Sequence, residues 1–152
     1  MSYVTAEARQ ELLDAVAVAI NEIGVALAAL GAAYELLDEH TADRLEDELF
    51  RPAQVAYGRA KRTHTGFADR YGLPRRDFEP ASAGLPSQGI KGFLANAVES
   101  VAEADMTLAE LQDSMMPVEV GDPEVRLQIA GVRELVSALP ERARQLERVL
   151  GR

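Results

Sequence analysis

Apolar residues recur at alternating spacings of three and four along several long segments of the chain. In the first segment this spacing continues without a break through Leu13, Val16, Ile20, Ile23, Leu27, Leu30, Tyr34 and Leu37. Such a pattern places an apolar stripe along one side of an α-helix. Together with residues that start and stop helices, it predicts helices over 5–39, 41–71, 88–115 and 123–150. No segment shows the period-two alternation of a strand, so we expect no sheet.

Prolines and glycines interrupt this helical pattern. Three prolines and two glycines fall within 72–87, which predicts an irregular loop. Pro52 and Pro140 lie inside helical segments, where the missing backbone N–H predicts kinks. Asp122 precedes Pro123 in the manner of a helix N-cap followed by proline at the first helical position.

The chain length fits a single domain over 1–152. Short connections join the first helix to the second and the third to the fourth, which makes these pairs antiparallel neighbours. We therefore predict an all-α, antiparallel, up-and-down four-helix bundle. The connection at His40–Thr41 contains neither glycine nor proline, so a continuous rod from Thr5 to Arg51 remains an alternative.

The first helix is apolar on more than one side. A second stripe of mostly apolar residues runs through Val18, Glu22, Val25, Ala29, Ala32 and Leu36. Such a helix is either central in a bundle or buried against a second copy. Its small residues, which permit close backbone approach, are Gly24, Ala28, Gly31 and Ala32. We expect a homodimer through this helix, and no membrane insertion because Asn21, Glu22 and Glu35 interrupt the apolar run.

Composition excludes several classes of function. The chain has no cysteine, which excludes disulfides and thiolate metal sites, and its net charge of −9 argues against nucleic acid as a partner. No N-terminal leader pattern is visible, which indicates a cytoplasmic protein. The predominance of arginine over lysine, with abundant alanine, is typical of high-GC bacterial sequences.

Charge is segregated along the chain. Residues 1–50 and 77–125 are each strongly acidic, whereas 51–76 and 126–152 are basic. In an up-and-down bundle, this alternation predicts ion pairs between neighbouring helices. The basic block also suggests a site for an anionic metabolite or an acidic protein partner. Its candidate residues are Arg59, Arg62, Arg70, Arg75 and Arg76.

Few residues suggest catalysis. A carboxylate-bridged metal site in a bundle needs Glu-x-x-His motifs, and neither His40 nor His64 has a glutamate three residues before it. We therefore expect no metal and no cofactor. Glu22 and His64 both lie on apolar stripes, and the two side chains would form an acid–base pair if they were close together. No motif for a catalytic nucleophile and no phosphate-binding loop motif is present, which favours a protein that is not an enzyme.

These observations favour a helical-bundle interaction protein that self-associates through its first helix. The alternative is a protein or enzyme that binds an anionic small molecule in a pocket between helices, near Glu22 and His64.

Overall fold

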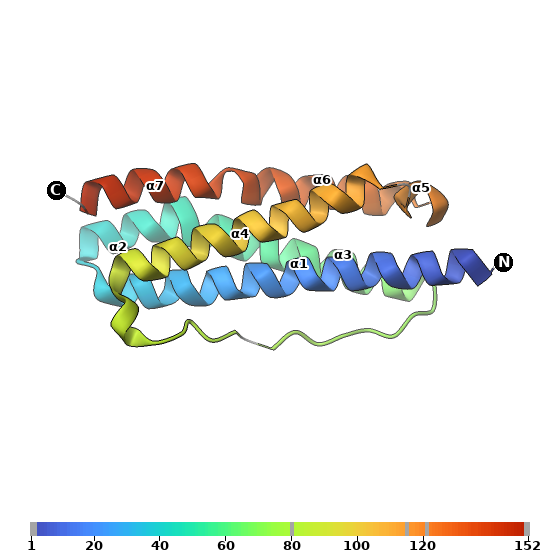
Figure 1. The fold of residues 1–152 in the computed structure, drawn as a ribbon, viewed down its shortest axis with the longest axis horizontal. Helices are drawn as coiled ribbons and strands as arrows, with labels where there is room; N and C mark the ends of the chain where they lie inside the picture. The colour runs from blue at the N-terminus through green and yellow to red at the C-terminus, as the bar shows by residue number, and fades with distance from the viewer. Residues whose placement is uncertain (1–2, 80, 115, 121, 151–152) are drawn as a thin grey trace.

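The computed structural model describes residues 3–79, 81–114, 116–120 and 122–150. Within this part of the chain all regular structure is helical, and the elements form four rods (Figure 1). The first rod is α1 (Tyr3–Leu36), and the third is α4 (Gly89–Asp113). The second rod consists of α2 (Glu39–Leu45), the π-helical turn η1 (Glu46–Phe50) and α3 (Arg51–Arg70). The fourth consists of α6 (Pro123–Ser137) and α7 (Leu139–Leu150). Two short helices precede and follow α4, namely the 3-10 helix η2 (Pro86–Gln88) and α5 (Met116–Val120). The all-α four-helix bundle predicted from the sequence is thus confirmed.

The order in which the rods are connected differs from the predicted up-and-down arrangement. One core cluster joins residues 8–23 of α1 to residues 56–68 of α3, to the C-terminal half of α4 and to α6. The other joins the C-terminal half of α1 to η1, to the start of α4 and to α7. The second and third rods therefore run in the same direction, and the up-and-down connectivity is wrong at this step (Figure 1).

The second and third rods run in the same direction because they are not neighbours in the bundle. The main contacts of α1 are with α4 and α3, and those of α6 are with α3 and α4. Hence α3 and α4 occupy opposite corners, and every pair of adjacent rods is antiparallel. The connection between α3 and α4 must return along the bundle, and we call its residues 71–79 and 81–85 the crossover segment. An extended chain of this length reaches about 50 Å, enough to follow α1 from end to end (Figure 1).

The first two rods are separate helices. The chain reverses at Leu37–Asp38, which excludes the continuous rod. Asp38 is the N-cap of α2, and its carboxylate accepts hydrogen bonds from the Thr41 backbone N–H (2.9 Å) and hydroxyl (3.1 Å). At the fourth rod, Asp122 is the N-cap as predicted and accepts from the Val125 N–H at 3.0 Å. Met115, where the third helix was predicted to end, lies outside the described residues.

Both predicted proline positions coincide with helical irregularities. Pro52 follows η1, and because it has no N–H it cannot donate to the carbonyl of Glu48 four residues earlier. Arg142 of α7 donates to that carbonyl at 3.2 Å instead. Near Pro140 the fourth rod divides into α6 and α7 at Ala138. Each irregularity lies just before its proline, where the missing donor has its effect.

Charge did not select neighbouring rods in the predicted way. The two acidic rods, α1 and α4, pack side by side, and the basic α3 lies beside α6. Ion pairs between rods are confined to few places in the described residues, such as Arg133 of α6 with Asp105 of α4 at 2.9 Å. Burial of apolar surface is worth far more than exposed ion pairs, so it determined the pairing.

Candidate functional site

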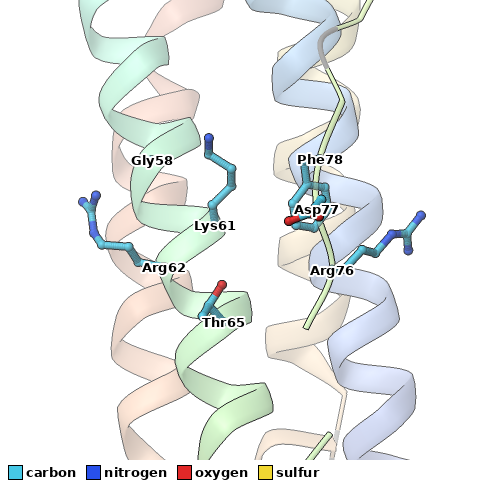
Figure 2. A pocket seen from close by; sticks show the side chains of 7 residues that line it. All are labelled: Gly58, Lys61, Arg62, Thr65, Arg76, Asp77 and Phe78. Carbon is cyan, nitrogen blue, oxygen red and sulfur yellow. The ribbon is translucent and has the colours of Figure 1, made fainter. Parts of the chain in front are cut away.

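Two adjoining hollows lie between α3 and the crossover segment. The first has a volume of about 530 Å³ and carries most of the charge. It is lined by Gly58, Lys61, Arg62, Thr65, Arg76, Asp77 and Phe78 (Figure 2). The second, of about 350 Å³, extends over α1. It is lined by Gly24, Leu27, Ala28, Phe50, Tyr57, Lys61, Phe78 and Ala81. Lys61 and Phe78 line both hollows, so we treat them as the cationic end and the apolar end of one groove.

The cationic end has two polar groups at its centre. Figure 2 shows Lys61 extending along α3 beside the gap between α3 and the crossover segment, with Thr65 one turn further along the helix. The guanidinium groups of Arg62 and Arg76 stand at its two sides and are directed outwards. The Lys61 ammonium lies 4.3 Å from the centre of the Tyr57 ring, which stabilises the cation by the charge distribution of the aromatic face. The cation thus stands where the charged and apolar ends meet.

The five arginines predicted to form an anion site have different surroundings. Arg70 pairs with Asp122 at 2.9 Å and with Glu124 at 3.2 Å, at the start of α6. Arg75 makes two hydrogen bonds of 2.8 Å to Asp69. These two arginines have a structural role, because carboxylates already neutralise them.

The other three arginines have no ion pair within 4 Å among the described residues. They are Arg59, Arg62 and Arg76. Lys61, which was not among the predicted site residues, also has no ion pair within this distance in the described residues. Arg62 and Arg76 border the cationic end of the groove, on opposite sides. Arg59 borders a separate hollow of about 290 Å³ between α3 and α6. The structure therefore divides the predicted cluster, and only part of it surrounds the groove.

The paired arginine Arg70 belongs to a cluster that closes one end of the bundle. Tyr71 donates to Asp122 at 3.0 Å, and the Arg9 guanidinium lies 4.0 Å above the Tyr71 ring. Burial by itself raises the pKa of Asp122, but hydrogen bonds from Val125, Tyr71 and Arg70 outweigh it and hold the pKa below the ordinary value. Asp122 is thus an anion at neutral pH that joins α3 to α6.

His64 is buried beneath the crossover segment, with 2% of its surface exposed. Its ring meets Phe78 edge to face, with centres 5.2 Å apart, and its Nδ1 has no hydrogen-bond partner. Burial lowers the pKa of His64 below 6.5, the positive charge of Arg76 lowers it further, and Asp14 partly opposes both. His64 is therefore neutral at pH 7, and it supports the aromatic side chain that lines the groove.

Glu22 lies on the other side of α1, against α4. Burial raises the pKa of Glu22 above the ordinary 4.5, and hydrogen bonding and like charge from Glu103, with the charge of Glu99, raise it further. Asp14, the acidic residue that influences His64, is about 12 Å from Glu22 along the helix axis at 1.5 Å per residue. The structure therefore does not bring Glu22 and His64 together as the predicted acid–base pair.

Sequence reasoning missed most of the groove lining. Phe78 and Asp77 lie in a segment predicted only as an irregular loop. Tyr57 and Phe50 lie within the helix predicted over 41–71, and neither was proposed as a site residue. One signal was available, because Phe78 is the single aromatic residue in the proline-rich sequence 72–87. An isolated aromatic residue in such a loop indicates that the loop packs against the core.

Two further observations concern metals and membranes. Among the described residues, no group of three or more acidic or histidine side chains is arranged to hold a metal ion. By length and composition, Thr5–Leu36 is long and apolar enough to cross a membrane, a test that the core helix of a soluble bundle also passes. In this structure that helix packs against α3, α4 and the crossover segment.

Comparison of the chain with protein-family models, with curated proteins and with solved structures found no match.

Proposed function

We propose that the protein binds an anionic small molecule at the cationic end of the groove. One observation carries this proposal: Lys61, Arg62 and Arg76 line a hollow of about 530 Å³, and none of the three has an ion-pair partner among the described residues. The nearby Arg70 and Arg75 are paired with carboxylates, so the acidic side chains of this region bind those two arginines and not the cations of the groove. Unpaired cations around a hollow attract an anion.

The geometry favours a small ligand over a protein surface. The hollow has the size of small-molecule sites and lies between α3 and the crossover segment. Lys61 and Thr65 line it, and their ammonium and hydroxyl groups are hydrogen-bond donors (Figure 2). Arg62 and Arg76 are exposed on either side of the hollow, so rotation about their side-chain bonds would bring the guanidinium groups toward an anion held between them. Asp77, at the same hollow, confines the anion to the α3 side by repulsion.

Binding is favoured over catalysis. The described lining residues of the groove include no serine, cysteine or histidine. His64 is covered by Phe78, and Glu22 faces α4. The arrangement supplies donors and positive charge, which hold an anion in place without transferring a proton or an acyl group.

The proposal is tested by following backbone amide chemical shifts while inorganic phosphate is added at constant ionic strength. We expect shifts confined to Lys61, Thr65, Asp77, Phe78 and their neighbours. Lys61→Gln should weaken phosphate binding about tenfold, equivalent to about 1.4 kcal/mol for one charge-assisted hydrogen bond. The matched control is Lys91→Gln, because Lys91 is the other lysine of the chain and lies exposed on α4. Absence of shifts in the groove, or equal weakening by both variants, would overturn the proposal.

Self-association through α1 is a second candidate. It is supported by the exposure of Val18 (48%) and Leu36 (52%) on this helix. Against it, the remaining sides of α1 are covered by α3, α4 and the crossover segment, which accounts for much of its apolar character. Native mass spectrometry decides between the candidates. A dimer that Val18→Glu converts to a monomer supports self-association, and a monomer that carries a small anion supports the groove.

A further inference from the structure

We infer that the ligand of the groove is an amphipathic anion, with a negative head group at Lys61 and an unbranched aliphatic chain along the apolar end. This inference rests on the proposed function and adds the class of ligand. It starts from the continuity of the two hollows, since Lys61 and Phe78 line both. A ligand bound to the Lys61 ammonium has direct access to the apolar end.

The apolar end has the size and lining that an aliphatic chain requires. Its volume of about 350 Å³ is within the range of small-molecule pockets. Apart from the shared Lys61, its lining is made of aliphatic, aromatic and glycine residues. Its lining residues on η1 and α3, from Phe50 to Lys61, spread over about 16 Å of helix at 1.5 Å per residue, a length that an aliphatic chain can follow.

Small residues of α1 create this space. Gly24 and Ala28 are one turn apart and both line the apolar end. A Cβ added at Gly24 would stand 3.4 Å from Cε1 of Tyr57, so this position faces the aromatic wall of the groove directly. A larger side chain at either position would occupy the volume assigned to the chain of the ligand.

The charges at the two ends determine the orientation of the ligand. Beyond Phe50 the next hollow is lined by Gly31, Tyr34, Glu35 and Glu46. Two carboxylates at that end repel an anionic head group, whereas Lys61, Arg62 and Arg76 attract it at the other. A ligand with negative charge at both ends fits less well than one with a single anionic head. A purely polar anion leaves the aromatic and aliphatic walls uncovered.

The first test measures the affinity of the full-length protein for acetate, butyrate, hexanoate and octanoate by calorimetry. We expect affinity to rise about two- to fourfold per added methylene, as burial of each group from water requires. Octylammonium and octanol serve as controls and should bind at least tenfold more weakly than octanoate. Affinity that is independent of chain length would overturn this inference but leave the anion site of the proposed function intact.

A variant separates the two ends. Ala28→Leu fills the apolar end, so octanoate should bind about tenfold more weakly while phosphate binding at the cationic end is unchanged. The matched control is Ala102→Leu, which adds the same side chain at an exposed position of α4. If octanoate binding is the same in both variants, the apolar end is not the site of the chain. If octylammonium binds as well as octanoate, the proposed function fails while the apolar site remains.

Discussion

The two sides of α1 present small residues to different partners, with opposite results. On the side of Glu22, which faces α4, successive turns carry fully buried alanines: Ala19, Ala26, Ala29 and Ala33. On the side that faces α3 and η1, the small residues are Gly24, Ala28 and Gly31, and they line hollows. Small residues therefore permit close approach but do not enforce it.

The difference lies in what stands opposite. The core-facing positions of α4 include small residues such as Ala97 and Ala104, so its backbone can approach α1 closely. Opposite Gly24 and Ala28 stand the larger rings of Tyr57 and Phe50, which line the same hollow. The crossover segment covers the gap only in part. α1 thus packs closely against α4 on one side, which we call the closed seam, and borders the groove on the other.

The largest expected effect comes from enlarging a residue on each side of α1. Ala26→Leu inserts a larger side chain into the closed seam and should destabilise the fold by about 1–3 kcal/mol, because a packed core tolerates added methylenes poorly. Ala28→Leu on the groove side should change stability by less than about 1 kcal/mol. Thermal unfolding of both variants, monitored by circular dichroism, measures the difference. Equal destabilisation would mean that the groove is as tightly packed as the seam.

A smaller effect concerns pH on the groove side. The pKa of His64 is lower in the folded protein than its ordinary 6.5, so the unfolded state binds more protons just below pH 6.5. The contribution of His64 to stability is therefore present above pH 6.5 and is lost as pH falls through the folded pKa, at up to about 1.4 kcal/mol per pH unit. Denaturant titrations from pH 7 to 5 should show this slope reduced in His64→Gln. His40→Gln is the control, because His40 is exposed, and a slope that survives in His64→Gln would assign it to other groups.

The smallest effect concerns the closed seam and has the opposite sign. The pKa of Glu22 is higher in the folded protein than in the unfolded chain. Its contribution to stability is therefore present below pH 4.5 and is lost as pH rises through the folded pKa. Glu22→Gln should raise stability at pH 7 by less than about 1 kcal/mol and remove this loss. Loss of stability in Glu22→Gln at pH 7 would show that the charge of Glu22 is favourable in the seam.

Local features of the chain were predictable from the sequence because they depend on nearby residues. The buried positions Leu13, Val16 and Ile20 follow from helical spacing, and the N-cap Asp122 follows from its place before Pro123. The irregularities before Pro52 and Pro140 follow from the missing backbone donor. The start of the second helix was predicted less accurately: it was placed at 41, whereas α2 begins at Glu39 after the N-cap Asp38, to which Thr41 donates.

The candidate site was predictable only in part. The basic block was visible in the sequence, but its division into paired Arg70 and Arg75 and unpaired Arg62 and Arg76 depends on acids that the fold brings close. Asp122, for example, is 52 residues from Arg70 along the chain. Glu22 and His64 were both placed on apolar stripes, yet they face opposite sides of α1. A stripe identifies a buried side but not the element that covers it.

The sequence by itself determined that this protein is a set of long amphipathic helices, where prolines interrupt them, and that a proline-rich segment connects two of them. These properties arise from backbone chemistry and from contacts within a few residues. Only the tertiary structure decided that α3 and α4 are parallel, that the two acidic rods are neighbours, and that the crossover segment borders a groove. These properties arise from packing between distant segments, where the shapes of facing side chains determine which surfaces close and which stay open.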